Sequence, residues 1–103
     1  LHISGSNVGD TGMESLKELT NLTELGLAST RVSDAGLEHL KGLPKLQSII
    51  LDGNQITDAG IAHLEGMPKL NRLNLRKTQV TAQGVAELIR SLKQSRIDWD
   101  KGK

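Results

Sequence analysis

The sequence has 103 residues, enough for one modest core, with 36% hydrophobic side chains and a formal net charge of +1. Its 13 basic and 12 acidic residues nearly balance, so no bulk charge favours nucleic acid or an anionic membrane, and we expect neither as a partner. The absence of cysteine excludes disulfides, thiolate metal sites and a cysteine nucleophile.

Nearly the whole chain repeats itself with a period of 24 residues. Residues 31–46 read RVSDAGLEHLKGLPKL, and residues 55–70 read QITDAGIAHLEGMPKL. A constant period of this length predicts structural units that stack on one another. The same apolar columns recur in residues 22–32, 46–56 and 70–80.

The first residues enter this pattern partway through a unit. Leu1, Ile3 and Val8 occupy apolar columns of the later units, so the chain begins in the middle of an expected strand. A strand with an open edge and an open core beside it needs a cover. We therefore expect further repeats or another subunit at this end, and a chain that is the C-terminal part of something longer.

Each unit combines a short strand with a short helix. Leu25 and Leu27 alternate with small or polar residues, which is the period-2 pattern of a strand with one buried face. Leu37, Leu40 and Leu43 then recur at a three-residue spacing, typical of the inner stripe of a helix. No unit can bury both apolar faces alone, so stacking must place the strands in one parallel sheet and the helices opposite it.

A polar residue follows each expected strand in the same column. Its side chain would point into the bend, where backbone N–H and C=O groups lack strand partners. We predict a structural ladder rather than catalytic hydroxyls, because no histidine and acid recur beside it. The ladder comprises Ser6, Thr30, Asn54 and Thr78.

An aspartate column lies at the start of the expected helices. It holds Asp10, Asp34 and Asp58 and ends at Ala82. Either Ser33 or Asp34 stands where the N-cap belongs. A carboxylate here would cap its own helix by accepting backbone N–H bonds and would meet the positive end of the helix dipole. The alternative is a row of metal-binding carboxylates, but units stack too widely on this side to share an ion.

Two further columns are better explained by packing and surface exposure than by ligand binding. A recurrent glycine at the helix starts costs about 1 kcal/mol relative to alanine, so it predicts close approach of adjacent units rather than a phosphate loop. His39 and His63 stack on the helix face but lack a third ligand. We predict no metal and no cofactor. The glycines are Gly12, Gly36, Gly60 and Gly84.

The repeat pattern L-x-x-L-x-L-x-x-N-x-L resembles that of the leucine-rich repeat family over essentially the whole chain. The resemblance implies the ribonuclease-inhibitor-like class of α/β fold: a right-handed solenoid with a parallel concave sheet and short convex helices. It divides the chain into a partial repeat 1–21, repeats 22–45, 46–69 and 70–93, and a C-terminal cap 94–103.

The C-terminal segment departs from the period in the manner of a cap. A longer helix is expected over residues 83–93, and Ile97 and Trp99 supply a last pair of inward strand positions. The segments SDAGL and TDAGI resemble bacterial repeats of the TDAGL type. Such chains close on Leu-Pro-x-Cys-x-Ile-x-Trp-Asp, which residues 92–100 match except at Lys93 and Ser95.

The outward strand positions form the candidate functional face. Scaffold demands do not fix them, and Ile50 is an apolar side chain at their centre with arginines around it, as in a protein-binding hot spot. The strip measures only roughly 300 Å², below the ~800 Å² per partner of a stable complex. We predict a non-catalytic protein-binding module; the alternative is a structural cap or spacer of a larger protein. The candidate contacts are Glu24, Ser48, Ile50, Asp52, Arg72, Asn74, Arg76, Lys77 and Arg96.

Overall fold

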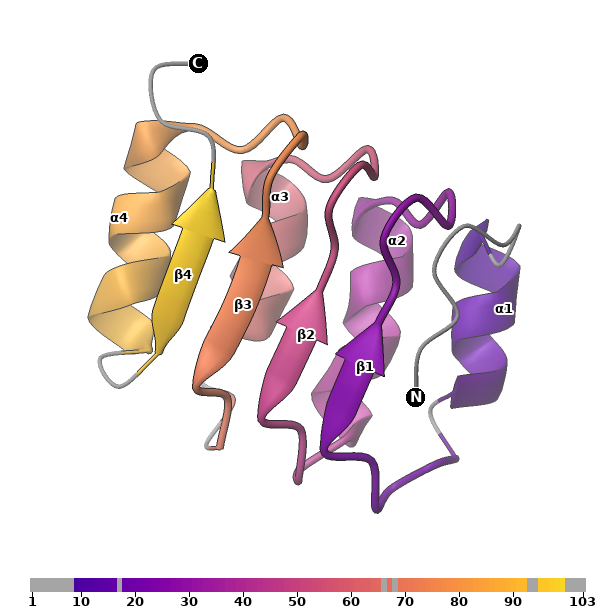
Figure 1. Cartoon of the computed structure of the whole chain (residues 1–103). Coiled ribbons are helices and arrows are strands. Elements are labelled where there is room, and N and C mark those ends of the chain that lie inside the picture. Colours follow the sequence, from indigo (N-terminus) through magenta and orange to yellow (C-terminus); the bar gives the residue numbers. More distant parts are fainter. Residues whose placement is uncertain (1–8, 17, 66, 68, 93–94, 100–103) are drawn as a thin grey trace.

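The four strands of the described residues lie in one sheet, and the helices form a second layer on one of its faces (Figure 1). The computed structural model describes residues 9–16, 18–65, 67, 69–92 and 95–99. The strands are β1 (Glu24–Gly26), β2 (Ser48–Ile50), β3 (Arg72–Leu75) and β4 (Arg96–Trp99). The helices are α1 (Gly9–Leu16), α2 (Asp34–Leu37), α3 (Asp58–Ile61) and α4 (Ala82–Ser91), with the 3₁₀ segments η1 (Glu38–Gly42) and η2 (Ala62–Leu64).

The sheet is parallel, and its order β1-β2-β3-β4 follows the chain. Each residue pairs with the one 24 positions further on, so that Glu24 lies beside Ser48, Ser48 beside Arg72, and Arg72 beside Arg96. Parallel neighbours need a crossover connection, which the helical segment of each unit provides. This arrangement confirms the predicted α/β repeat fold.

One aliphatic core runs between the two layers. Leu25, Ile49 and Leu73 project into it from neighbouring strands, and each is at most 1% exposed. Leu40 and Leu64 belong to the same cluster and come from the helical side. Burying a side chain of this size contributes about 1.5–3 kcal/mol, so a unit gains stability only when its neighbours cover it.

The polar residues after the strands bond to the backbone of the bend. Asn54 accepts from the N–H groups of Thr30 and Val32 through Oδ1, at 3.0 and 3.2 Å. Its Nδ2 donates to the carbonyls of Leu27 and Leu51, at 2.7 and 3.0 Å. One buried amide therefore ties two successive bends together. Thr30 and Thr78 are buried as well, and each donates from Oγ1 to the carbonyl three residues earlier, at 2.7 Å. Ser6 lies outside the described residues.

The aspartate column does not cap its own helices, which corrects the prediction from the sequence. Ser33 and Thr57 stand at the N-cap positions of α2 and α3, without a side-chain cap bond. The Asp34 carboxylate instead reaches the next unit, where it accepts from the Thr57 N–H at 2.8 Å and the Thr57 hydroxyl at 2.5 Å. Spacing had identified the column but not the direction in which its side chains turn.

This inter-repeat carboxylate contact recurs along the stack. Asp10 bonds Ser33 in the same two-point manner, and Asp58 bonds Thr81. At Thr81 the hydroxyl also accepts from the Gly84 N–H at 3.3 Å, so the last helix does receive a side-chain cap. The contact ends where Ala82 replaces the aspartate.

The helix-start glycines make room for those carboxylates. A Cβ added to Gly60 would overlap Asp34 Oδ1, and one added to Gly84 would overlap Asp58 Oδ1. Gly36 stands in the same relation to Asp10. The close approach expected from the sequence is therefore an approach of the preceding aspartate.

The C-terminal unit differs from the others in its helix. α4 is a regular helix that begins at Ala82 and ends at Ser91, rather than spanning residues 83–93. Val85 and Leu88 lie on its buried inner face. Ile97 and Trp99 pack against the core but stay partly exposed, so the end of the stack is less fully covered than its middle.

Asn54 is the residue whose loss should damage the bends most. Asn54→Leu removes the acceptor of the Thr30 and Val32 N–H groups and the amide donor of the Leu51 carbonyl, while the Leu27 carbonyl keeps the Thr30 hydroxyl. We expect it to lower the free energy of unfolding by about 3 kcal/mol or more. Asn54→Thr keeps one bond of the kind made by Thr30 and Thr78, so it should cost roughly half as much. Urea unfolding of both variants measures the difference, and equal losses would contradict the proposed role of the amide.

Gly60 tests the packing of one unit on the next. Alanine favours a helix by about 1 kcal/mol over glycine, but a methyl group here meets a carboxylate fixed by two hydrogen bonds. We expect Gly60→Ala to be destabilising by about 1–3 kcal/mol net. In a double-mutant cycle with Asp34→Ala, the pair should be coupled by about 1 kcal/mol or more, and additive losses would show that the two residues do not meet.

Candidate protein-binding surface

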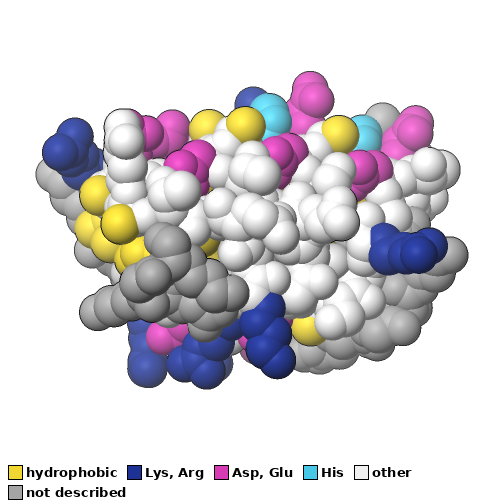
Figure 2. All heavy atoms as spheres, turned by 90° about the horizontal axis from the view of Figure 1, so that it is seen from above, with side chains coloured by type: hydrophobic (Ala, Val, Ile, Leu, Met, Phe, Trp, Pro, Cys, Tyr) yellow, Lys and Arg dark blue, Asp and Glu magenta, His cyan; other side chains and the backbone are white. Residues whose placement is uncertain are grey.

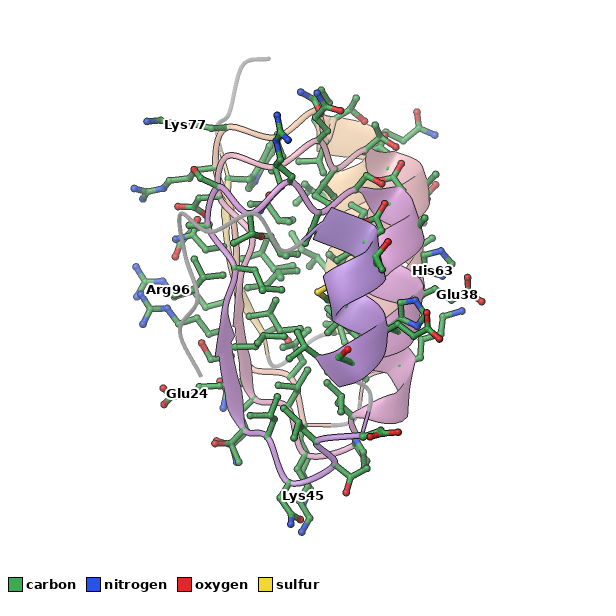
Figure 3. All side chains as sticks on the ribbon, turned by 90° about the vertical axis from the view of Figure 1, so that its right-hand side faces the viewer. Glu24, Glu38, Lys45, His63, Lys77 and Arg96 are labelled. Atoms are coloured by element: carbon green, nitrogen blue, oxygen red, sulfur yellow. The ribbon has the colours of Figure 1, made fainter. Side chains whose placement is uncertain are left out.

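The helices leave one face of the sheet uncovered, and we call it the outer sheet face. Figure 3 shows Glu24, Lys77 and Arg96 projecting on this side, while Glu38 and His63 project from the helices opposite. Successive strand residues alternate between core and outer face. The strand positions of the outer face are Glu24, Ser48, Arg72 and Arg96 in one row and Gly26, Ile50, Asn74 and Asp98 in the next.

Ile50 lies at the centre of this face. In the sheet register it stands between Gly26 on β1 and Asn74 on β3. Gly26 is buried, because it has no side chain to project beyond its neighbours. Ile50 and Asn74 are half-buried. The centre of the face is therefore a shallow apolar area with the Asn74 amide beside it.

The exposed cations lie toward the later strands. Arg72, Arg76, Lys77 and Arg96 are all exposed, and Arg96 is 79% exposed. Its Nε lies 3.6 Å from Asp98 Oδ1, an ion pair too exposed to contribute much stability. Figure 2 shows basic side chains along the sheet side, with the histidines and many of the acids on the helix side.

Acidic and small polar groups complete the face. Glu24 on β1 is exposed, while Ser48 and Asp52 are half-buried. The charge therefore changes from acidic on β1 to basic on β3, across the apolar residue on β2. An apolar centre between opposite charges can orient a partner as well as attract it.

The turns after β1, β2 and β3 each adopt a left-handed backbone at one shared column. Ser29, Gly53 and Lys77 occupy the same column and have φ values of 53°, 74° and 58°. Glycine adopts this region without strain, whereas serine and lysine do so at some cost. The turns therefore hold their side chains in a fixed direction at the edge of the outer sheet face.

A recess that sequence reasoning missed lies at these turns. It has a volume of about 430 Å³ and is lined by polar residues of two successive bends. Arg31 contributes to it and has a φ of 65°, unlike its column mate Gln55. A repeating sequence pattern does not predict a left-handed backbone that occurs at Arg31 and not at the equivalent Gln55. The lining comprises Ser29, Arg31, Gly53, Asn54 and Gln55.

Other kinds of site find no support in the described part of the chain. Within those residues, no three or more His, Asp or Glu side chains are grouped so that they could hold a metal ion. His39 in η1 and His63 in η2 are half-buried. Figure 3 shows His63 on the helix side, away from the outer sheet face. None of the helices in the described ranges combines the length and apolar content needed to cross a membrane.

Comparison with known families assigns this architecture. The family model described as "Leucine rich repeat" matches residues 1–56 and 20–80, which together span most of the chain. The protein belongs to the leucine-rich repeat family. A search of curated proteins found no match.

A solved structure shares the fold. The chain described as "Leiomodin-1 Actin-Binding Site 2 (ABS2)" aligns with a TM-score of 0.70 and 19% sequence identity. The alignment covers 99% of this chain and 71% of that one. At this identity the likeness establishes the fold alone.

Proposed function

We propose that this protein is a non-catalytic protein-binding module whose contact surface is the outer sheet face around Ile50 and Arg76. The observation that carries the proposal is Ile50 itself, an aliphatic side chain at the centre of the face that the helices leave uncovered. Hot spots of protein interfaces combine a desolvated apolar or aromatic centre with arginines at its edge. Arg72 and Arg76 stand in that relation to Ile50.

The charges favour one chemistry of partner. We propose a partner that places an apolar side chain over Ile50 and acidic groups over Arg72, Arg76, Lys77 and Arg96. Its opposite flank would carry a basic group facing Glu24 and Asp52. Asn74 and Ser48 supply polar contacts at the centre. A polyanion such as nucleic acid fits less well, because Asp98 lies beside Arg96 and the opposite flank is acidic.

The strands alone offer less area than a stable complex needs. The recess at the strand ends extends the surface, since Ser29 and Gly53 belong to both. We propose that a loop of the partner enters the recess and meets Arg31 and Gln55. The contact then approaches the ~800 Å² per partner typical of specific complexes.

The name of the structural relative agrees with protein recognition as the class of function. That structure is described as an actin-binding site, so a leucine-rich repeat fold of the same shape is there associated with protein binding. The likeness does not identify actin as the partner of this chain. The alternative function is a structural cap or spacer, favoured by the partly covered end of the stack rather than by the outer sheet face.

Two finer assignments are also proposals. The SDAGL and TDAGI segments, together with the Ile97 and Trp99 ending, support a place among bacterial repeats of the TDAGL type. The unit boundaries 22–45, 46–69 and 70–93 follow from the 24-residue register and remain our division of the chain.

The test is the affinity of a partner captured from the source organism and then purified. We expect Ile50→Asp to weaken binding about 30-fold or more, because it places a charge in the desolvated centre. Arg76→Glu should weaken it about tenfold, chiefly by slowing association. Matched controls on the helix side, Glu38→Lys and His63→Asp, should bind as the wild type does. Wild-type affinity of Ile50→Asp, with loss in the controls, would place the contact on the helices instead.

A further inference from the structure

The last helix is more apolar on its outer flank than the helices inside the stack. With about 3.6 residues per turn, Ala82, Ala86 and Ile89 fall on one line of α4. Gly84, which lies against Asp58 of α3, marks the opposite flank. The line therefore points away from the repeats. All three residues are exposed, and Ile89 is 49% exposed.

Comparison with the inner units shows that this flank is unusual. The position of Ile89 is held by Lys41 and Glu65 in the preceding units, and that of Ala82 by Asp34 and Asp58. A terminal repeat that faces water should carry a more polar outer flank than its neighbours. Here the change runs the other way. Figure 2 shows hydrophobic side chains gathered at the α4 end of the molecule.

The last strand presents a matching backbone edge. The Arg96 N–H donates to Asn71 O at 2.7 Å, so residues 96 and 98 bond toward β3. Alternation directs the N–H and C=O of Ile97 away from β3, and among the described residues no strand lies beyond β4. Ile97 therefore offers a donor and an acceptor at the edge of the sheet.

The side chains of this edge are complementary to themselves. Arg96 and Asp98 flank Ile97 on the outer sheet face. In an antiparallel pair of two β4 strands centred on Ile97, Arg96 of one copy stands opposite Asp98 of the other, twice. The register that matches the charges is also the one in which the two Ile97 residues exchange backbone hydrogen bonds.

The α4 flank obeys the same symmetry. In two antiparallel α4 helices centred between Val85 and Ala86, the large Ile89 of one copy faces the small Ala82 of the other. A two-fold interface requires such self-complementary surfaces. The sizes of the facing residues on the helix and the charges on the strand are therefore both matched by a two-fold axis.

We propose that two copies of this chain associate end to end through β4 and α4 about a two-fold axis. The principal dimensions of the molecule, 32, 26 and 19 Å, limit the contact at one end to roughly 500–800 Å² of flat area per copy. Interfaces of this size are weak and reversible. The sheets of the two copies become continuous, and the outer sheet face of each stays open.

A charge-reversal cycle tests the proposal in the isolated chain without any partner. Sedimentation equilibrium from about 10 µM to about 1 mM should show the wild-type mass rising toward twice the monomer value. Arg96→Asp and Asp98→Arg each place like charges opposite one another across the axis, and each should weaken association about tenfold or more. The double variant R96D/D98R restores opposite charges and should restore the dimer.

Two further variants complete the design. Ile89→Lys gives α4 a lysine, the residue that Lys41 provides at the same position of an earlier repeat. It should abolish association while the chain stays folded, as circular dichroism would show. Arg72→Asp changes the same outer row one strand inward and should leave association unchanged. A wild-type chain that stays monomeric at all concentrations overturns the proposal. The proposal is also overturned if the single variants lose the dimer and R96D/D98R does not restore it. The double change restores opposite charges only where the contact is made with a second copy of the same chain.

Discussion

Parallel pairing of strands that lie 24 residues apart is the constraint on which the rest of this structure depends. It places equivalent strand residues of neighbouring units side by side, so a position that is buried in one strand is buried in the next as well. It also forces the helices to one side, because each crossover must return to start the next strand in the same direction. The opposite side of the sheet remains uncovered, and that face is available for recognition.

The polar groups that the stack buries are satisfied between units. The Asn54 amide bonds to the bend before its own, and the Asp34 carboxylate bonds to the start of the next helix. These bonds cross from one unit to another in register, so a unit that slipped would lose them together with its leucine contacts. Stability is therefore a sum over neighbouring interfaces, as expected for a repeat array.

The sequence predicted the rows but not every direction within them. Alternation at Leu25 and Leu27 was sufficient to predict strands, because a half-buried strand has no other pattern. Spacing placed Asp34 at a helix start but could not show that its carboxylate turns to Thr57 of the next unit. The recess is lined in part by Arg31, which has a left-handed backbone that its column mate Gln55 does not share, and no composition or period encodes that difference. On the outer sheet face, position follows from the register, while half-burial of Ile50 follows from its neighbours and was visible only in three dimensions.

The in-register stack can be measured directly, because the chain contains no cysteine to compete with introduced pairs. Parallel neighbours lie about 4.8 Å apart, within the Cα separation that a disulfide allows, and strands two apart lie about twice as far. Oxidation of dilute Ser48→Cys/Arg72→Cys protein should therefore give an intramolecular disulfide, detected by mass and thiol titration. The pair Glu24→Cys/Arg72→Cys should remain reduced. Equal cross-linking of both pairs, or of the second alone, would contradict the stacking on which the binding surface depends.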